Sequence, residues 1–193
     1  MYKMCKTEHS AARQRALEIG LLKAMKTCRY ESVSVSDLCD QLQIPRKSFY
    51  RYFSSKDGAL QAMVDHTLME FEDYTMGLWA GRTRTMQQDL EGFFLFWKNH
   101  RDFLDALAYS NLGGMLIERA VAYSLTEDIM PRRFLPDDDA QMQRQIVIFG
   151  VCGMLSMVLT WHSEGFRTPP GEMARFAARI LSQPLFPGVE KFM

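Results

Sequence analysis

The sequence has few residues that bind metals or form disulfides, and those it has are dispersed. Four cysteines and four histidines are scattered along the chain: Cys5, Cys28, Cys39, Cys152, His9, His66, His100 and His162. The cysteines lie far apart and form no metal-type pair, the histidines are equally scattered, and Cys39 and Cys152 lie among apolar residues, where a free thiol behaves as a small hydrophobe. The pattern indicates a reduced, cytoplasmic protein without a disulfide framework, a cofactor or a metal site.

Long apolar runs are also missing. Residues 1–6 lead into polar sequence without the apolar segment of an export signal. The longest mostly apolar run, 146–161, is shorter than the roughly 20 residues that a membrane span needs, and it contains Gly150 and Gly153. These features favour a buried helix over a membrane-spanning one.

Signatures of catalysis are absent as well. The sequence has no Gly-rich phosphate loop, no Gly-x-Ser-x-Gly elbow and no paired histidines on one helix face. The acidic run 137–139 suits the N-terminus of a helix, where the helix dipole favours negative charge, better than a metal site. An enzyme on a helical scaffold therefore has no group of residues to support it, and we predict that the protein is not an enzyme.

The formal net charge of zero conceals an uneven distribution. Residues 1–56 hold eleven Lys or Arg against five Asp or Glu, whereas residues 57–193 hold twelve against eighteen. A basic N-terminal part suits a phosphate backbone, and an acidic remainder repels it. The asymmetry predicts that double-stranded DNA binds at one end of the molecule, although chance drift of charge along the chain is the simpler alternative.

Helical spacing of apolar residues recurs throughout the chain, and alternation typical of strands is rare. It predicts an all-α fold of about nine helices, at 8–28, 34–42, 46–52, 56–76, 84–99, 102–110, 112–129, 138–164 and 170–182. We expect residues 1–56 to form a three-helix DNA-binding domain and residues 57–193 to form a helical effector-binding and dimerisation domain. The fourth helix would be the rod that joins them.

The second and third helices are separated by a short turn, as in a helix-turn-helix, whose second helix enters the major groove. In the helix at 46–52, Phe49 and Phe53 share one face and are expected to anchor it in the core. Lys47, Ser48 and Arg51 then project from the opposite face toward the groove. Arginine and lysine read guanine, and a good bidentate pair contributes about 1–3 kcal/mol of discrimination between bases.

Four further side chains complete the predicted DNA-binding set. Arg46 stands at the start of the recognition helix, where base edges are usually reached. Tyr50 and Tyr52 lie on its two flanks, where a phenol can meet phosphate oxygens, although both could instead pack between helices. Lys56 begins the next helix, whose N-terminus also favours a phosphate.

Residues 34–39 and 44–60 resemble the N-terminal signature of the tetracycline-repressor (TetR) family. The specific part is a tyrosine, two residues, a phenylalanine, two small residues and a lysine ahead of a helix, here Tyr50, Phe53 and Lys56. The resemblance covers about residues 12–65. It implies base contacts from Arg46, Lys47 and Ser48, and phosphate contacts from Ser34, Tyr50, Tyr52 and Lys56. The chain departs from the family pattern in its turn, at Gln43 and Pro45, where the family usually has a glycine and a small capping residue.

The C-terminal part is rich in large apolar side chains and methionines, which suit an adaptable pocket. Candidate pocket residues are Phe93, Phe96, Trp97, Phe103, Leu107, Met115 and Trp161. The alternative, a plain aromatic core, is at least as compatible with helical spacing. The resemblance implies an effector pocket in this part of the chain without identifying its residues.

The helix containing 146–161 is apolar nearly all round, so it must be covered on every side. Candidate residues of a dimer interface are Phe149, Gly150, Gly153, Met157, Phe176 and Ile180. The resemblance implies a four-helix bundle in which two copies of this helix meet two copies of the helix at 170–182. A two-fold dimer would read a palindromic operator.

Taken together, these features predict a homodimeric transcriptional regulator that does not bind a membrane. We expect a repressor that a small apolar or amphipathic effector releases from DNA. The alternative is a DNA-binding regulator controlled by a partner protein, for which an exposed apolar groove over a solid core would be the sign.

Overall fold

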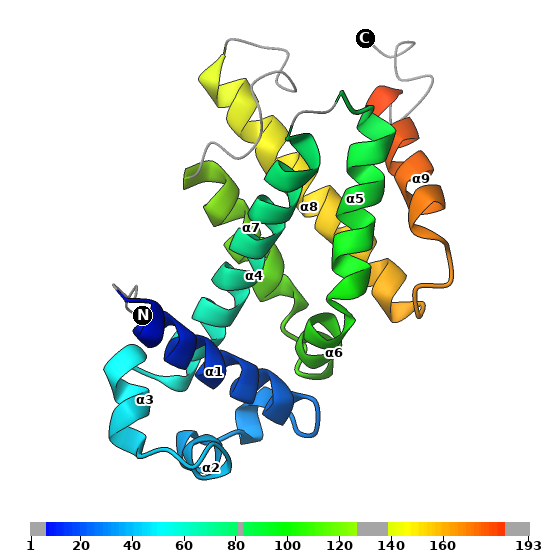
Figure 1. Ribbon diagram of the computed structural model, residues 1–193. Coiled ribbons are helices and arrows are strands. Elements are labelled where there is room, and N and C mark those ends of the chain that lie inside the picture. The colour runs from blue at the N-terminus through cyan, green and yellow to red at the C-terminus, as the bar shows by residue number, and fades with distance from the viewer. Residues whose placement is uncertain (1–6, 81–82, 127–138, 184–193) are drawn as a thin grey trace.

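The computed structural model describes residues 7–80, 83–126 and 139–183. An N-terminal module of short helices lies at one end of the molecule (Figure 1). It consists of α1 (Glu8–Met25), a 3-10 turn η1 (Tyr30–Ser32), α2 (Val35–Gln41) and α3 (Arg46–Tyr52). The helix-turn-helix predicted at 34–53 is therefore formed by α2 and α3.

Local signals in the sequence explain where α2 and α3 begin. The Ser34 hydroxyl oxygen caps α2 by accepting from the Asp37 N–H at 3.0 Å, which satisfies one of the unpaired donors of the first turn. Pro45 precedes α3 in extended conformation. Between them, Gln43 adopts a positive φ of 53°, the conformation that explains why a glycine is usual at this turn.

The predicted anchor of the recognition helix is confirmed. Phe49 and Phe53 are 0% and 1% exposed, and their ring centroids lie 5.3 Å apart. They pack in a core that includes Leu21 and Met25 of α1 and Leu38 of α2. Burial of Phe49 and Phe53 thus fixes the rotation of α3 about its axis, so the opposite face of the helix points away from the core.

Helix α4 (Lys56–Trp79) rises from this module into the rest of the molecule (Figure 1). The Ser55 hydroxyl caps it by accepting from the Gly58 N–H at 3.1 Å. Along its length α4 packs against α1, α5 and α7, and the buried apolar residues of the module and the body form one continuous cluster. The division at residues 56 and 57 therefore falls at the first turn of a helix that both parts share, and it stays a prediction.

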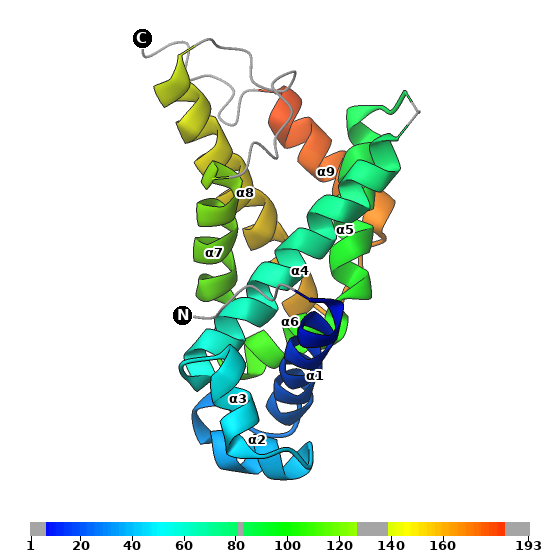
Figure 2. The same cartoon turned by 60° about the vertical axis from the view of Figure 1, so that its left-hand side comes forward.

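Five helices complete the body: α5 (Met86–Asn99), α6 (Arg101–Tyr109), α7 (Gly113–Thr126), α8 (Ala140–Ser163) and α9 (Pro170–Ser182). Helix α5 packs mainly on α9, and α7 packs mainly on α8, as both views show (Figures 1 and 2). The predicted all-α fold is confirmed, with nine α-helices in the part of the chain that the structure describes.

Several helix ends differ from the prediction. Helix α1 stops at Met25 rather than at residue 28, because the N–H groups of Lys26 and Thr27 bind carbonyls three residues back and tighten the last turn. Asp139 caps α8 by accepting from the Gln141 N–H at 2.8 Å, while residues 137 and 138 of the acidic run lie outside the described residues. Residues 127–129, expected to end the helix at 112–129, also lie outside them.

Helix α8 is covered on one side only by the described part of the chain, and its predicted coverage by a second copy stays a prediction. Helix α8 is long and apolar enough to cross a membrane by length and composition, with a mean hydropathy of 1.7, but only 22% of that segment is buried within the chain. Val147, Leu155 and Val158 face the core. The opposite face carries Met142 and Phe149 and is exposed, because none of the described helices covers it.

Candidate nucleic-acid interface

The face of α3 opposite its aromatic anchor is basic and open to solvent. Arg46, Lys47 and Arg51 are exposed, and Ser48 is half-buried. None of these four side chains forms an ion pair or a hydrogen bond with another described residue in the structure. They are therefore available to a ligand outside the chain, and their positive charge makes that ligand an anion.

The two tyrosines that the sequence placed on the flanks of α3 differ in exposure. Tyr50 is 50% exposed, and its ring meets the edge of Phe49 at a centroid distance of 5.5 Å. Tyr52 is only 7% exposed and packs beside Phe53. Tyr50 is thus placed for an external contact, whereas the ring of Tyr52 belongs to the core of the module.

Lys56 is bound within the chain. Its ammonium group donates to the backbone carbonyls of Tyr30 at 2.7 Å, Glu31 at 3.2 Å and Val33 at 2.7 Å, and it lies 4.3 Å from the centroid of the Tyr30 ring. These contacts use all three of its donors. The geometry therefore gives Lys56 a positioning role, in which it fixes the η1 turn against the start of α4.

Ser34 is similarly engaged. Besides accepting from the Asp37 N–H, its hydroxyl donates to the Asp37 carboxylate at 2.6 Å. A phosphate at this position would have to replace that carboxylate as the acceptor. The predicted phosphate contact from Ser34 thus competes with an existing hydrogen bond.

Tyr30 connects the module to the body, a role that sequence reasoning missed. Its hydroxyl donates to Asp57 at the start of α4, and its backbone N–H donates to the buried Ser110 hydroxyl at 2.9 Å. Burial, followed by the hydrogen bond to the Asp57 carboxylate, raises the pKa of Tyr30 well above its usual value. The phenol therefore remains a neutral donor at physiological pH.

A hollow of about 330 Å³ lies between α1 and α3. Its lining consists of Arg13, Ala16, Leu17, Leu42, Ile44, Pro45, Ser48, Arg51 and Tyr52. The hollow brings together three predicted DNA-binding residues with Arg13, which the sequence did not single out. Arg13 lies next to these three residues only because α1 and α3 pack side by side in the folded module, which the sequence alone does not show.

A buried carboxylate links α1 to α4. The side chain of Glu18 is fully buried and accepts a hydrogen bond from Arg15 at 3.0 Å. His66 Nδ1 of α4 lies 2.8 Å from the same carboxylate. Since a buried charge is costly unless it is paired, these contacts hold α1 and the first half of α4 together.

The seven predicted pocket residues lie within one cluster of the body, and five of them are buried in its core: Phe96, Trp97, Phe103, Leu107 and Trp161. The remaining two, Phe93 and Met115, are partly buried against it. Trp97 is 1% exposed, and its indole N–H has no hydrogen-bond partner among the residues that the structure describes. The cluster thus combines an apolar aromatic environment with one unsatisfied donor.

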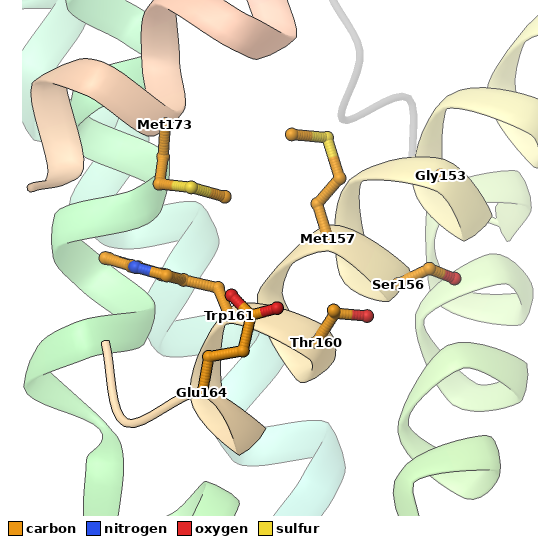
Figure 3. A pocket seen from close by; sticks show the side chains of 7 residues that line it. All are labelled: Gly153, Ser156, Met157, Thr160, Trp161, Glu164 and Met173. Carbon is orange, nitrogen blue, oxygen red and sulfur yellow. The ribbon is translucent and has the colours of Figure 1, made fainter. Parts of the chain in front are cut away.

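A second hollow, of about 310 Å³, lies on the outer face of α8 and α9. Gly153, Ser156, Met157, Thr160, Trp161, Glu164 and Met173 line it (Figure 3). Met157 of α8 and Met173 of α9 project at its two sides (Figure 3). Of the predicted dimer residues, Gly153 and Met157 line this hollow, and Phe149, Phe176 and Ile180 are exposed on the same two helices.

A helix-turn-helix whose second helix presents a free basic face has the geometry with which such motifs enter the major groove of DNA. Residues 30–63 match the family model described as bacterial regulatory proteins, tetR family. This segment contains η1, α2, α3 and the first turns of α4. No curated protein sequence matches the chain.

Solved structures of the same fold match nearly the whole chain. The fatty acid degradation regulator FadR from Bacillus halodurans has a TM-score of 0.63 and 12% identity, covering 92% of this chain and 96% of that one. A tetR-family regulator from Streptomyces coelicolor has a TM-score of 0.57 and 17% identity, covering 89% and 79%. The repressor AlkX from Dietzia sp. strain DQ12-45-1b has a TM-score of 0.56 and 15% identity, covering 87% and 92%.

Residues 30–63 therefore match the tetR-family signature that the sequence predicted, and the chain shares the fold of solved tetR-family regulators.

Proposed function

We propose that the protein is a cytoplasmic, homodimeric repressor that binds a palindromic DNA operator and leaves it when a small apolar or amphipathic effector binds the body. The free basic face of α3 carries the proposal. Arg46, Lys47 and Ser48 would contact base edges, and Tyr50 would contact a backbone phosphate.

The exposed apolar face of α8 and α9 supports the homodimer. Phe149, Phe176 and Ile180 are all exposed on it, and a Cβ added at Gly150 or Gly153 would meet no atom within 4 Å. The two glycines thus leave room for a second backbone to approach closely. A two-fold dimer would bury this face and place two recognition helices on successive turns of the duplex.

The unsatisfied indole N–H of Trp97 supports a small effector. A buried donor without an acceptor is unfavourable by about 1–3 kcal/mol, and a ligand with one acceptor group and an apolar remainder would relieve it. Two of the similar structures belong to regulators described in terms of fatty acid degradation and of n-alkane biodegradation. An effector with a long apolar chain fits both observations.

Control by a partner protein is the second candidate. The hollow beside Met157 and Met173 is open at the surface of α8 and α9, where adaptable methionine side chains suit a protein ligand. Under this hypothesis, the partner and the second copy of the chain would use neighbouring parts of one face. Effector binding to the purified dimer, without any added protein, would favour the first candidate.

Selection of bound sites from random duplex DNA tests the proposed function. We expect the purified protein to enrich a palindrome whose half-sites lie about one helical turn apart. Recovery of no common site would contradict DNA recognition, and recovery of an asymmetric single site would contradict the dimer.

Substitutions on α3 test the assignment of its side chains. Lys47→Ala should relax the preference at one base pair and weaken binding to the selected site by about 1–3 kcal/mol. Tyr50→Phe should weaken binding to all sequences alike, because it removes a phosphate contact only. Equal losses at every sequence from both variants would show that the register of α3 on the groove is wrong.

A further inference from the structure

The hollow between α1 and α3 is lined by both charged and apolar side chains. Leu17 of α1 and Leu42 and Ile44 of the turn supply apolar atoms, and two arginines come from the two different helices. No acidic residue lines it. The hollow thus brings two positive charges together without a counter-charge in its lining.

Neither arginine is neutralised elsewhere among the described residues. Arg13 and Arg51 form no ion pair and no hydrogen bond there, in contrast to Arg15, which binds Glu18 and Glu70, and to Arg119, which binds Asp65. Two like charges that flank one hollow repel each other unless an anion lies between them. Their placement therefore favours an anionic ligand.

Tyr52 gives an independent indication. Its ring is buried, it lines the hollow, and its hydroxyl has no hydrogen-bond partner within the described chain. The hydroxyls of two other partly buried tyrosines do have partners, Tyr30 with Asp57 and Tyr123 with Glu72, whereas the half-buried Tyr74 has none among the described residues. The Tyr52 hydroxyl is not itself a buried unpaired atom, so it is open to solvent and available to a ligand in the hollow that its side chain lines.

We propose that this hollow receives one backbone phosphate of the DNA duplex, held by Arg13 from α1 and Arg51 from α3, with the Tyr52 hydroxyl as a third donor. Two guanidinium groups and a phenol match the acceptor oxygens of a phosphate, and the apolar lining residues suit the adjoining deoxyribose. The hollow shares Ser48 and Arg51 with the free face of α3, which is why the phosphate belongs to DNA rather than to a small molecule.

The inference rests on the proposed DNA binding and changes its details. Helix α1, which the sequence left out of the interface, becomes a contact element through Arg13. Arg51 binds the backbone instead of reading a base, so sequence preference depends on Arg46, Lys47 and Ser48. Tyr52 contributes through its hydroxyl although its ring belongs to the core.

Duplexes with a single methylphosphonate test the contact, since each such linkage removes the charge of one phosphate. With the selected operator, the wild-type dimer should lose affinity about ten- to hundredfold when the contacted phosphate is neutralised. The Arg13→Ala variant should bind the unmodified operator less tightly by a similar factor. The slope of its log binding constant against log salt concentration should be smaller in magnitude by about 1 for each half-site. Neutralising that phosphate should then reduce the operator affinity of the Arg13→Ala variant little further.

Lys23→Ala is the matched control, because Lys23 is also an exposed cation on α1 but lies outside the hollow. The Lys23→Ala variant should lose the same affinity as the wild type when any one phosphate is replaced by a methylphosphonate. Tyr52→Phe should reduce sensitivity at the same phosphate as Arg13→Ala does. Circular dichroism and urea unfolding of each variant would separate lost contacts from lost folding.

The results also separate the two proposals. A wild-type protein that binds no duplex DNA refutes the proposed function itself. Wild-type binding with an Arg13→Ala variant that responds normally to every methylphosphonate refutes only the phosphate assignment. A third outcome would assign the hollow to a free anion and overturn the proposal. In that case, millimolar inorganic phosphate would inhibit DNA binding by the wild type more than chloride of equal ionic strength does, the Arg13→Ala variant would not show this inhibition, and no phosphate of the duplex would depend on Arg13.

Discussion

Truncating Phe149 should weaken the homodimer more than any other single substitution on α8. The side chain is 61% exposed in the single chain. Because a fully buried aromatic side chain covers about 150–250 Å², a second copy would bury about 120 Å² of Phe149. At about 25 cal/mol per Å² this corresponds to roughly 3 kcal/mol, and two-fold symmetry counts it twice. The expected change of about 6 kcal/mol raises the dimer Kd roughly 10⁴-fold.

Sedimentation equilibrium of wild type and Phe149→Ala, at matched concentrations, measures this change. The cost of losing translational freedom on association is the same for both proteins, so it cancels in the comparison. Ile19→Ala is the control, because Ile19 is 45% exposed on α1 and lies in the DNA-binding module. A dimer Kd for Phe149→Ala within threefold of the wild type would refute the assignment of this face.

Three further substitutions test other parts of the structure by urea unfolding. Gln43→Gly should stabilise the protein by about 1 kcal/mol, since it removes a left-handed non-glycine residue; a loss would contradict this. Trp97→Phe should lower the free energy of unfolding by about 1–3 kcal/mol less than Trp161→Phe does, because of the two indole N–H groups only that of Trp161 binds a backbone carbonyl. Equal losses of stability would refute this difference. Glu18→Ala should lower the free energy of unfolding by about 3 kcal/mol, whereas Glu70→Ala, at an exposed residue, should lower it by at most about 1 kcal/mol. The reverse order would show that Glu18 is not the main electrostatic link between α1 and α4.

Much of the N-terminal module could be predicted because its signals are local. The capping hydroxyl of Ser34, the proline before α3 and the four-residue spacing of Phe49 and Phe53 each determine a helix start or a buried face within a few residues. The positive φ at Gln43 was not visible, because only the family pattern, and no feature of the residue itself, marks that turn as left-handed.

Features that depend on contacts between distant segments could not be predicted. The charge of Lys56 suggested a phosphate, yet three carbonyls of the η1 turn surround its ammonium group. Arg13 gave no signal, because its proximity to Arg51 arises only when α1 packs across the helix-turn-helix. The apolar character of α8 on all sides did indicate from the sequence that a second copy covers part of it, but which face the chain leaves uncovered depends on how α7 packs against it.

The contacts of α4 limit how an effector can act on DNA binding. The fully buried carboxylate of Glu18 joins α1 to His66, and Tyr30 joins η1 to Asp57 and to Ser110. Separating α1 and η1 from the start of α4 would break the Glu18–His66 contact and the Tyr30–Asp57 hydrogen bond, and would expose the apolar core that these elements share. An effector is therefore expected to move the recognition helix together with the first half of α4 as one body. The change in operator affinity would then come from the distance between the two recognition helices of the dimer, while the internal geometry of each module is kept.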